Sequence, residues 1–225
     1  MDAFRKTVLL GSLLFLFISG CLGINQERRK IDYYTLEYDA PKAMELEALP
    51  FVIYVNRFHV APLYNSNKIV YREKRFKTDA YVYHNWRANP GDIVTYLLAR
   101  DMRQSSLFNG VFAGEGRHSS SHAVEGTVDE FFEEDSDTLW HATLSISITL
   151  LAENEPDISK RVLFQKGYSV REPCAHKNPR AVAEAMSRAM ARISQLIRLD
   201  IYNHLAKEAN VKKSGFEGSR GQGFK

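Results

Sequence analysis

The sequence predicts an α+β protein: a single domain in which a mixed or antiparallel β-sheet packs with two principal helices. Over residues 139–151, apolar and polar residues alternate as in a strand with one buried face. After Asn89-Pro90, and again after Asn178-Pro179, apolar residues recur at the three- and four-residue spacing of an amphipathic helix. The composition, 44% hydrophobic and 25% charged, is that of a globular protein and excludes a chain that is disordered throughout.

Four β segments are expected before the first helix. Residues 33–38 predict the first strand. Residues 51–55 are apolar on both parities, which is typical of a central strand covered on two faces. Residues 68–76 and 79–86 predict a pair of neighbouring strands.

The first helix is predicted to begin at Pro90. A proline suits the first helical position, and Asn89 before it can accept hydrogen bonds from the free amides of the first turn. Its apolar residues share one face: Ile93, Val94, Leu97, Leu98 and Met102. Ser105-Ser106 and Gly110 are expected to end the helix.

A loop rich in Gly and Ser, residues 113–121, precedes three further strands. They are predicted at residues 123–132, 139–151 and 161–170, the last pairing with the one before it. In the middle strand, Trp140, Ala142, Leu144, Ile146, Ile148 and Leu150 share one parity, and His141, Thr143, Ser145, Ser147 and Thr149 share the other. The sheet is therefore expected to have one dry face and one wetter face.

A long helix after Asn178-Pro179 completes the predicted domain, residues 32–211. Its apolar face comprises Val182, Met186, Ala189, Ile193, Leu196, Ile197, Ile201 and Leu205, and its polar face comprises Glu184, Arg188, Arg192 and Gln195. We interpret it as a helix packed on the core, with contact to a partner as the alternative. Residues 212–225, a Gly-rich basic tail, are expected to be disordered.

Residues 1–20 have the features of a secretory signal peptide. Arg5 and Lys6 precede an uncharged stretch that ends at Gly20, which is shorter than the roughly 20 residues of a membrane-spanning helix. The stretch closes with Ile18-Ser19-Gly20-Cys21, which resembles the bacterial lipobox. The alternative is a cysteine that happens to end a signal peptide cut elsewhere.

The lipobox resemblance implies cleavage before Cys21, thioether lipidation of its sulfur and acylation of the new N-terminus. Acyl chains such as palmitate would then anchor the protein stably. Leu22 follows the cysteine where an Asp would favour the inner membrane, so we expect an outer-membrane protein that faces the periplasm. Residues 21–31 would form a lipidated tether, whose ten residues after the cysteine span at most about 35 Å.

The sequence contains no recognisable catalytic motif. Phosphate-binding, zinc-protease and nucleophile-elbow patterns are absent, so we expect no enzyme, cofactor or metal. A net charge of +3 is too small to drive tight nucleic-acid binding. Cys174, the second of two cysteines, is interpreted as a small packing residue or an inert loop thiol, because His176 alone is too little to indicate catalysis.

Three clusters have a structural and a functional interpretation. His118 and His122 have a spacing that could serve zinc on a helix, but a solvated loop is the simpler interpretation. An acidic run is interpreted as a solvated strand end and turn: Glu130, Glu133, Glu134, Asp135 and Asp137. Tyr81, Tyr83 and Trp86 are interpreted as core or interface packing, with a lipid-contact surface as the alternative.

Several short segments, taken in order, resemble one protein family. They are Tyr33-Tyr34-Thr35-Leu36, Val55 to Pro62, Ile69 to Glu73, Tyr83 to Trp86, Asn89-Pro90, Leu107-Phe108, Val124-Glu125-Gly126 and the Ala-rich last helix. Together, over residues 33–206, they resemble the ABC-type transport auxiliary lipoproteins, the family of paraquat-inducible protein C. The central loop and the tail depart from the family's pattern.

The resemblance implies a lipoprotein that works with an MCE-type (mammalian-cell-entry) periplasmic protein and an ABC permease and ATPase. Such systems move lipids or other hydrophobic molecules between two membranes, and the lipoprotein would dock the assembly without a catalytic role. The family also allows a ring-like homo-oligomer. Two alternatives stay open: an outer-membrane assembly or envelope-integrity lipoprotein that docks a different machine, and a periplasmic hydrolase.

Overall fold

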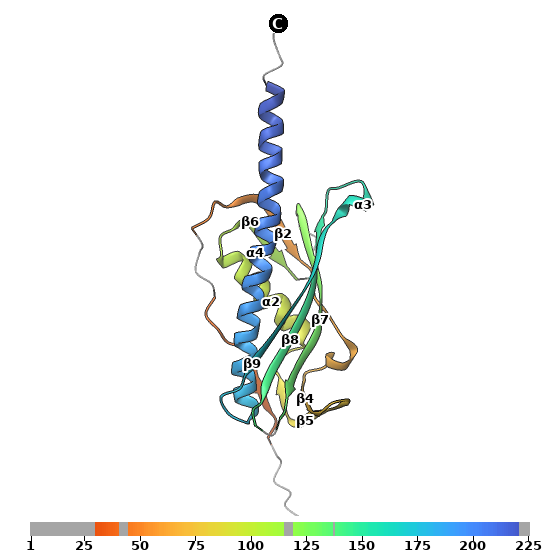
Figure 1. Ribbon diagram of the computed structural model, residues 1–225, viewed down its shortest axis with the longest axis vertical. Helices are drawn as coiled ribbons and strands as arrows, with labels where there is room; N and C mark the ends of the chain where they lie inside the picture. The colour runs from red at the N-terminus through yellow and green to blue at the C-terminus, as the bar shows by residue number, and fades with distance from the viewer. Residues whose placement is uncertain (1–29, 41–44, 115–118, 137, 221–225) are drawn as a thin grey trace, which may run out of the picture. The chain divides into compact units, whose positions relative to one another are not determined.

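The computed structural model describes residues 30–40, 45–114, 119–136 and 138–220, with side chains as far as Asn210. The described residues from Ile31 onward form one α+β domain, as predicted (Figure 1). The elements, in chain order, are β1 (Asp32–Tyr34), β2 (Leu49–Val55), β3 (His59–Val60), the 3-10 turn η2 (Pro62–Tyr64), β4 (Lys68–Lys74), β5 (Lys77–Trp86), α2 (Pro90–Gln104), β6 (Phe108–Ala113), β7 (His122–Glu134), β8 (His141–Ala152), α3 (Ile158–Arg161), β9 (Val162–Pro173) and α4 (Pro179–Arg220).

Strand β7 organises the sheet. One of its edges pairs with β8 along nearly its whole length, and β8 pairs in turn with β9, both antiparallel. The other edge of β7 takes β2, β3 and β4 one after another, all parallel to it. The sheet is therefore mixed, and its strands curl around the helices (Figure 1).

The first half of the chain supplies the remaining strands. β2 lies between β6 and β7, which confirms the prediction of a central strand, and β4 and β5 form the predicted antiparallel pair. β1 is shorter than predicted, because Leu36 and Tyr38 leave the sheet and pack against the core. β6 was not predicted, and Gly110, which was expected to end the first helix, lies inside this strand.

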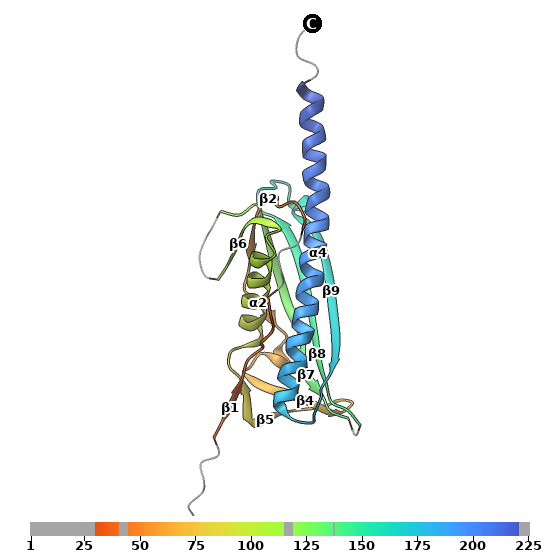
Figure 2. The ribbon, with the colours of Figure 1, turned by 90° about the vertical axis from the view of Figure 1, so that its left-hand side faces the viewer.

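Both long helices begin where the sequence predicted. The Asn89 side chain accepts a hydrogen bond from the Gly91 amide at 2.9 Å, and the Asn178 side chain accepts one from the Ala181 amide at 2.9 Å. α4 lies along β8 and β9 and covers their dry face (Figure 2). Seven of the eight residues predicted for its apolar face are buried, whereas Leu196 is 48% exposed and does not belong to that face.

The end of α4 differs from the prediction. The helix continues to Arg220, so residues 212–220 are helical where a disordered tail was expected, and it runs past the sheet (Figure 1). Once a helix has formed, each added residue gains one hydrogen bond, so a buried first half can carry a weakly helical sequence further. Residues 221–225 lie outside the described part of the chain. Among the described helices, none is both long and apolar enough to cross a membrane.

Candidate docking surface

The predicted site residues divide into those the structure describes and those it does not. Cys21, the predicted lipidation site, lies outside the described residues, as do His118 and Asp137. Cys174 is buried beside Trp140, whose carbonyl accepts its backbone amide, and burial raises the pKa of its thiol to about 11. Cys174 belongs to the buried hydrophobic core, which confirms its interpretation as a packing residue.

The sequence suggested that His122 lies in a solvated loop, and this prediction is wrong. His122 is the first residue of β7 and is buried, with its ring edge-on to Phe51 at 4.8 Å between centroids. Its Nε2 lies 3.4 Å from a carboxylate oxygen of Glu208 on α4. The imidazole therefore joins the sheet to the last helix, and the described residues contain no group of three side chains that could hold a metal ion.

Glu133 corrects the interpretation of the acidic run as solvated. Its side chain is fully buried, and its Oε1 accepts a hydrogen bond from the Tyr81 hydroxyl at 3.0 Å. The cause is a β-bulge in β7 between Val128 and Glu130, which moves the odd-numbered residues that follow onto the dry face, where Glu133 pairs with Ala142. Burial, assisted by the nearby Asp135 charge, raises the pKa of the Glu133 carboxyl to about 7, although the bond from Tyr81 opposes the shift.

The aromatic cluster divides between core and surface. Trp86 is buried edge-on to Phe131, with 5.1 Å between ring centroids, and the ring of Tyr81 lies 4.9 Å from that of Tyr71. Tyr83 stays exposed on β5. Core packing is therefore confirmed for Trp86, and lipid contact by the exposed part of the cluster stays a prediction.

A buried polar network fixes the first segment of the domain to both helices. Asp101 of α2 accepts hydrogen bonds from the Tyr38 hydroxyl at 2.7 Å and the Ser194 hydroxyl at 2.6 Å, and it pairs with Arg100 at 2.8 Å. Arg198 of α4 is also buried near this carboxylate. Burial lowers the pKa of its guanidinium, and the negative charge of Asp101 acts against that shift.

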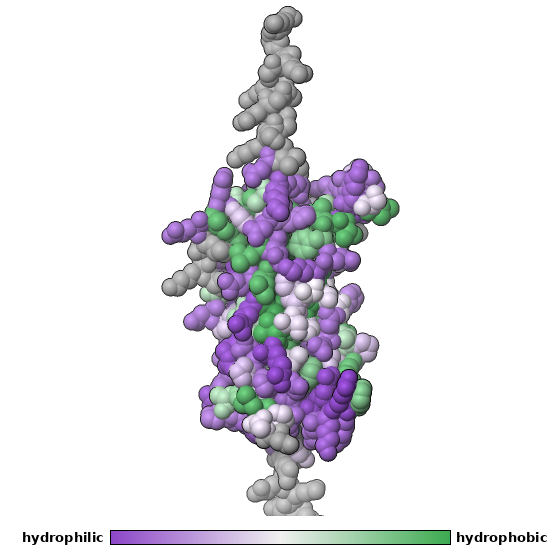
Figure 3. All heavy atoms as spheres, viewed as in Figure 1, coloured by the Kyte–Doolittle hydropathy of each residue, from purple (hydrophilic) through white to green (hydrophobic). Residues whose placement is uncertain are grey.

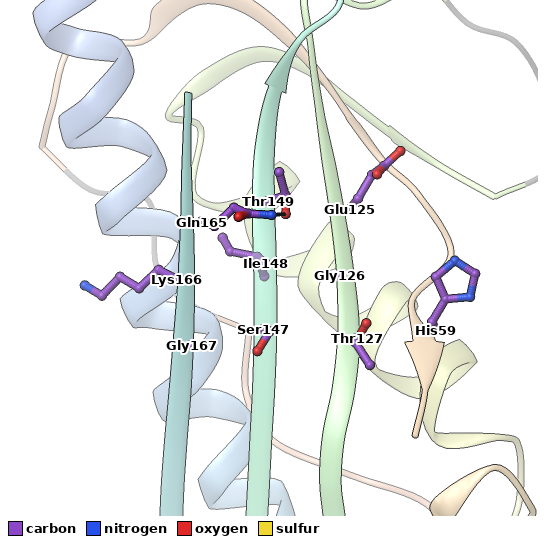
Figure 4. Close-up of a pocket in the computed structure, with 10 residues that line it drawn as sticks. All are labelled: His59, Glu125, Gly126, Thr127, Ser147, Ile148, Thr149, Gln165, Lys166 and Gly167. Atoms are coloured by element: carbon purple, nitrogen blue, oxygen red, sulfur yellow. Dashed lines mark hydrogen bonds between the residues drawn. The ribbon is translucent and has the colours of Figure 1, made fainter. Parts of the chain in front are cut away.

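An open groove of about 500 Å³ lies on the wetter face of the sheet (Figure 4). Strands β7, β8 and β9 form its floor, and His59 of β3 stands at its rim. The lining residues are His59, Glu125, Gly126, Thr127, Ser147, Ile148, Thr149, Gln165, Lys166 and Gly167. Figure 4 shows Thr127 and Ser147 on neighbouring strands, and Gln165 bonded to Thr149 at 2.9 Å.

The groove has the chemistry of a docking surface. Its alcohol and amide side chains can donate and accept hydrogen bonds, and Gly167 leaves the backbone of β9 uncovered there. The Ser147 hydroxyl donates a hydrogen bond to the Asp129 carboxylate at 2.6 Å. An extended polar partner therefore suits the groove better than an apolar molecule does.

A second, smaller groove of about 290 Å³ is mainly apolar. It lies between α2 and the segment after β1, and is lined by Thr35, Leu36, Arg87, Ala88, Asp92, Ile93, Tyr96 and Leu97. Sequence reasoning identified neither groove. The only sequence signal for this one is Tyr96, an aromatic residue on the polar side of the predicted helix, which is exposed in the structure.

Solved structures of other proteins share this fold. A protein of the DUF330 family from Xanthomonas campestris matches with a TM-score of 0.71 at 16% identity, over 80% of this chain and 99% of that one. An uncharacterised protein matches with a TM-score of 0.60 at 13% identity, over 76% of this chain and 99% of its own. At these identities the likeness shows the fold alone.

Sequence comparison identifies the family. No curated protein matches the chain. The profile of one family, described as the ABC-type transport auxiliary lipoprotein component, matches residues 34–198, well over half of the chain. This match begins at the last residue of β1 and ends inside α4, so it includes α2, the first part of α4 and every described strand from β2 to β9. The chain therefore belongs to the family of ABC-type transport auxiliary lipoprotein components.

Proposed function

We propose that this protein is an outer-membrane lipoprotein, anchored through Cys21, that serves an MCE-type ABC system in moving lipids or other hydrophobic molecules between two membranes. Family membership implies a membrane-anchored protein that faces the periplasm and is associated with an ABC transport system. The observation that carries the finer proposal is a lipobox-like cysteine 13 residues before the family match begins at Tyr34.

The outer membrane and the anchor are supported by local sequence. Leu22 occupies the position in which an Asp would favour retention in the inner membrane. Processing at Cys21 would leave the domain within about 35 Å of the lipid, because ten residues separate the cysteine from Asp32. A periplasmic partner that spans from the other membrane would then meet the domain close to the leaflet.

The chemistry of the domain supports docking as its role. The family is a transport auxiliary family and not a known enzyme family. The groove over β7, β8 and β9 offers hydrogen-bonding side chains to a protein partner, so we assign the MCE-type protein to this face. β9 pairs only with β8 among the described strands, and its second edge could pair with a further copy of the chain in a homo-oligomer.

Affinity purification from a mild detergent extract tests this function. We expect the tagged lipidated protein to recover an MCE-domain protein and an ABC permease, identified by mass spectrometry. Thr149→Arg places a long charged side chain in the groove and is expected to reduce that recovery. Thr78→Arg, on β5 outside the groove, is the matched control.

The result also discriminates the alternatives. If the folded, lipidated protein recovers β-barrel or lipopolysaccharide assembly proteins and no MCE or permease component, it is an envelope-assembly lipoprotein, and the proposed function is wrong. If both threonine variants retain full recovery of the MCE-domain protein, the groove is not the docking surface.

A further inference from the structure

The tip of the β4–β5 hairpin exposes an aromatic side chain, Phe76, that makes no contribution to the core. Arg75 and Phe76 form the turn between the paired residues Lys74 and Lys77. Phe76 is 94% exposed, the largest value among the exposed large hydrophobic residues of the described chain. Its φ of +69° lies in the left-handed region, where a bulky side chain is strained and Gly or Asn is favoured. Neither core packing nor turn geometry therefore accounts for a phenylalanine here.

Cations surround this aromatic ring. Lys74, Arg75 and Lys77 are all exposed, and the guanidinium carbon of Arg75 lies 5.0 Å from the centre of the Phe76 ring. Glu73 pairs with Lys77 at 3.2 Å, but both side chains are largely in water, where such a pair is weak. Figure 3 shows strongly hydrophilic side chains gathered over this end of β4 and β5. An exposed aromatic residue among basic ones is typical of segments that bind the surface of an anionic membrane.

The direction of β1 places this tip at the end of the domain where β1 begins. β1 runs parallel to β5 with Asp32 beside His84, so the chain enters β1 on the side of the sheet where β5 also starts. Lys77 lies seven residues before His84, which is about 23 Å along a strand. Figure 1 shows the hairpin and the start of the described chain at the same end of the domain, with the end of α4 at the other.

We propose that the hairpin tip, Lys74–Lys77, is a second membrane contact, in which Phe76 enters the headgroup region and the three cations bind anionic phospholipid headgroups. The proposal rests on the Cys21 anchor of the proposed function, which brings the leaflet within reach of the tip. The two attachments together would hold the domain in one orientation, with the end of α4 directed away from the membrane.

Vesicle binding by the chain without its acyl groups tests this contact. The probe is the chain from residue 21 onward with Cys21→Ser, sedimented with phosphatidylcholine vesicles that contain or lack phosphatidylglycerol. We expect binding to the anionic vesicles only, weakened by salt. Phe76→Gly is expected to lower the affinity about tenfold or more, the effect of withdrawing one phenyl ring from an apolar environment. Arg75→Gln is expected to lower it about fivefold, the effect of one charge near the surface.

Folding does not confound the Phe76 variant, because glycine relieves the left-handed φ; its melting temperature should not fall. Ile158→Gly on α3 is the matched control: Ile158 is 78% exposed beside Lys160 and Arg161, but α3 lies at the end of the domain opposite the hairpin (Figure 1). Failure of the parent to bind anionic vesicles, or an equal loss from Ile158→Gly and Phe76→Gly, would overturn the proposal. Neither result bears on the proposed lipidation of Cys21, because the probe carries no lipid. The intact mass of the native protein tests the lipidation separately.

Discussion

Glu133 ionises in the folded protein only at a pH well above its usual range. Its ordinary pKa of 4.5 is raised to about 7 by burial, so the unfolded state ionises first as the pH increases. Its contribution to stability is therefore complete below pH 4.5 and is lost as the pH rises toward 7. Glu133→Gln removes this titration.

We predict that Glu133→Gln gains stability relative to the parent, by up to about 3 kcal/mol, between pH 4 and pH 8. Urea denaturation at a series of pH values measures the difference. Glu134→Gln, one residue further along β7 and partly exposed, controls for loss of a carboxylate as such. A stability difference that is constant with pH would show that the Glu133 carboxyl does not titrate in this way.

Helix α2 carries one buried and one exposed aspartate, so the contribution of a buried charge to stability can be compared with that of an exposed one. Asp101 is buried and receives the Tyr38 and Ser194 hydroxyls, whereas the ion pair of Asp92 with Arg57 has side chains 48% and 57% exposed. Asp101→Ala leaves the buried cation of Arg198 without its counter-charge and is predicted to cost about 3–5 kcal/mol. Asp92→Ala is predicted to cost about 1 kcal/mol or less. Equal losses in the free energy of unfolding would contradict the network described here.

Two glycines of the polar groove differ in the space around them. A Cβ on Gly126 would lie 2.2 Å from the Phe58 ring and 2.7 Å from the Ser147 carbonyl oxygen, and Phe58 is fully buried. Gly126→Ala is therefore predicted to lower stability by about 1–3 kcal/mol. Gly167→Ala, whose Cβ would meet its nearest neighbour at 3.7 Å, is predicted to change it by less than about 0.5 kcal/mol. Thermal denaturation of both variants checks the contrast.

Among the secondary-structure elements, α4 depends on its first turn. The Asn178 side chain satisfies the Ala181 amide, which has no partner within the helix, and Asn178→Ala is predicted to cost about 1 kcal/mol. Asn203→Ala, at an exposed position in the helix interior, is predicted to be neutral or slightly stabilising, because alanine has the higher helix propensity. A melting temperature that falls equally in both variants would show that the cap contributes nothing.

Secondary-structure elements were predicted correctly where one local sequence pattern extended over many residues. β8 was predicted from its alternation, and its apolar parity is buried from Ala142 to Leu150. β3 and β6 were missed: β3 has only two residues, and β6 is fixed by its pairing with the distant strand β2. The bulge in β7 has no sequence signature, and for that reason the burial of Glu133 was not predicted.

In the molecule as a whole, the fold class and the family were accessible from the sequence, and the surfaces were not. The alternation of polarity and the two Asn-Pro helix starts are local features that the structure retains. The polar groove joins β3, β7, β8 and β9, so it exists only once their register is known. Cys21 is the opposite case: a short local motif predicts its role, and the residue lies outside the described part of the chain.

The central claim is that this transport auxiliary component is held at the membrane by a lipid on Cys21. The intact mass of the protein purified from native envelopes tests it most directly. We predict a chain that begins at Cys21 and carries a thioether-linked diacylglyceryl group and an N-terminal acyl chain, a mass that Cys174→Ala retains and Cys21→Ser loses. A product that keeps residues 1–20, or one that begins elsewhere with a free thiol, would contradict the account.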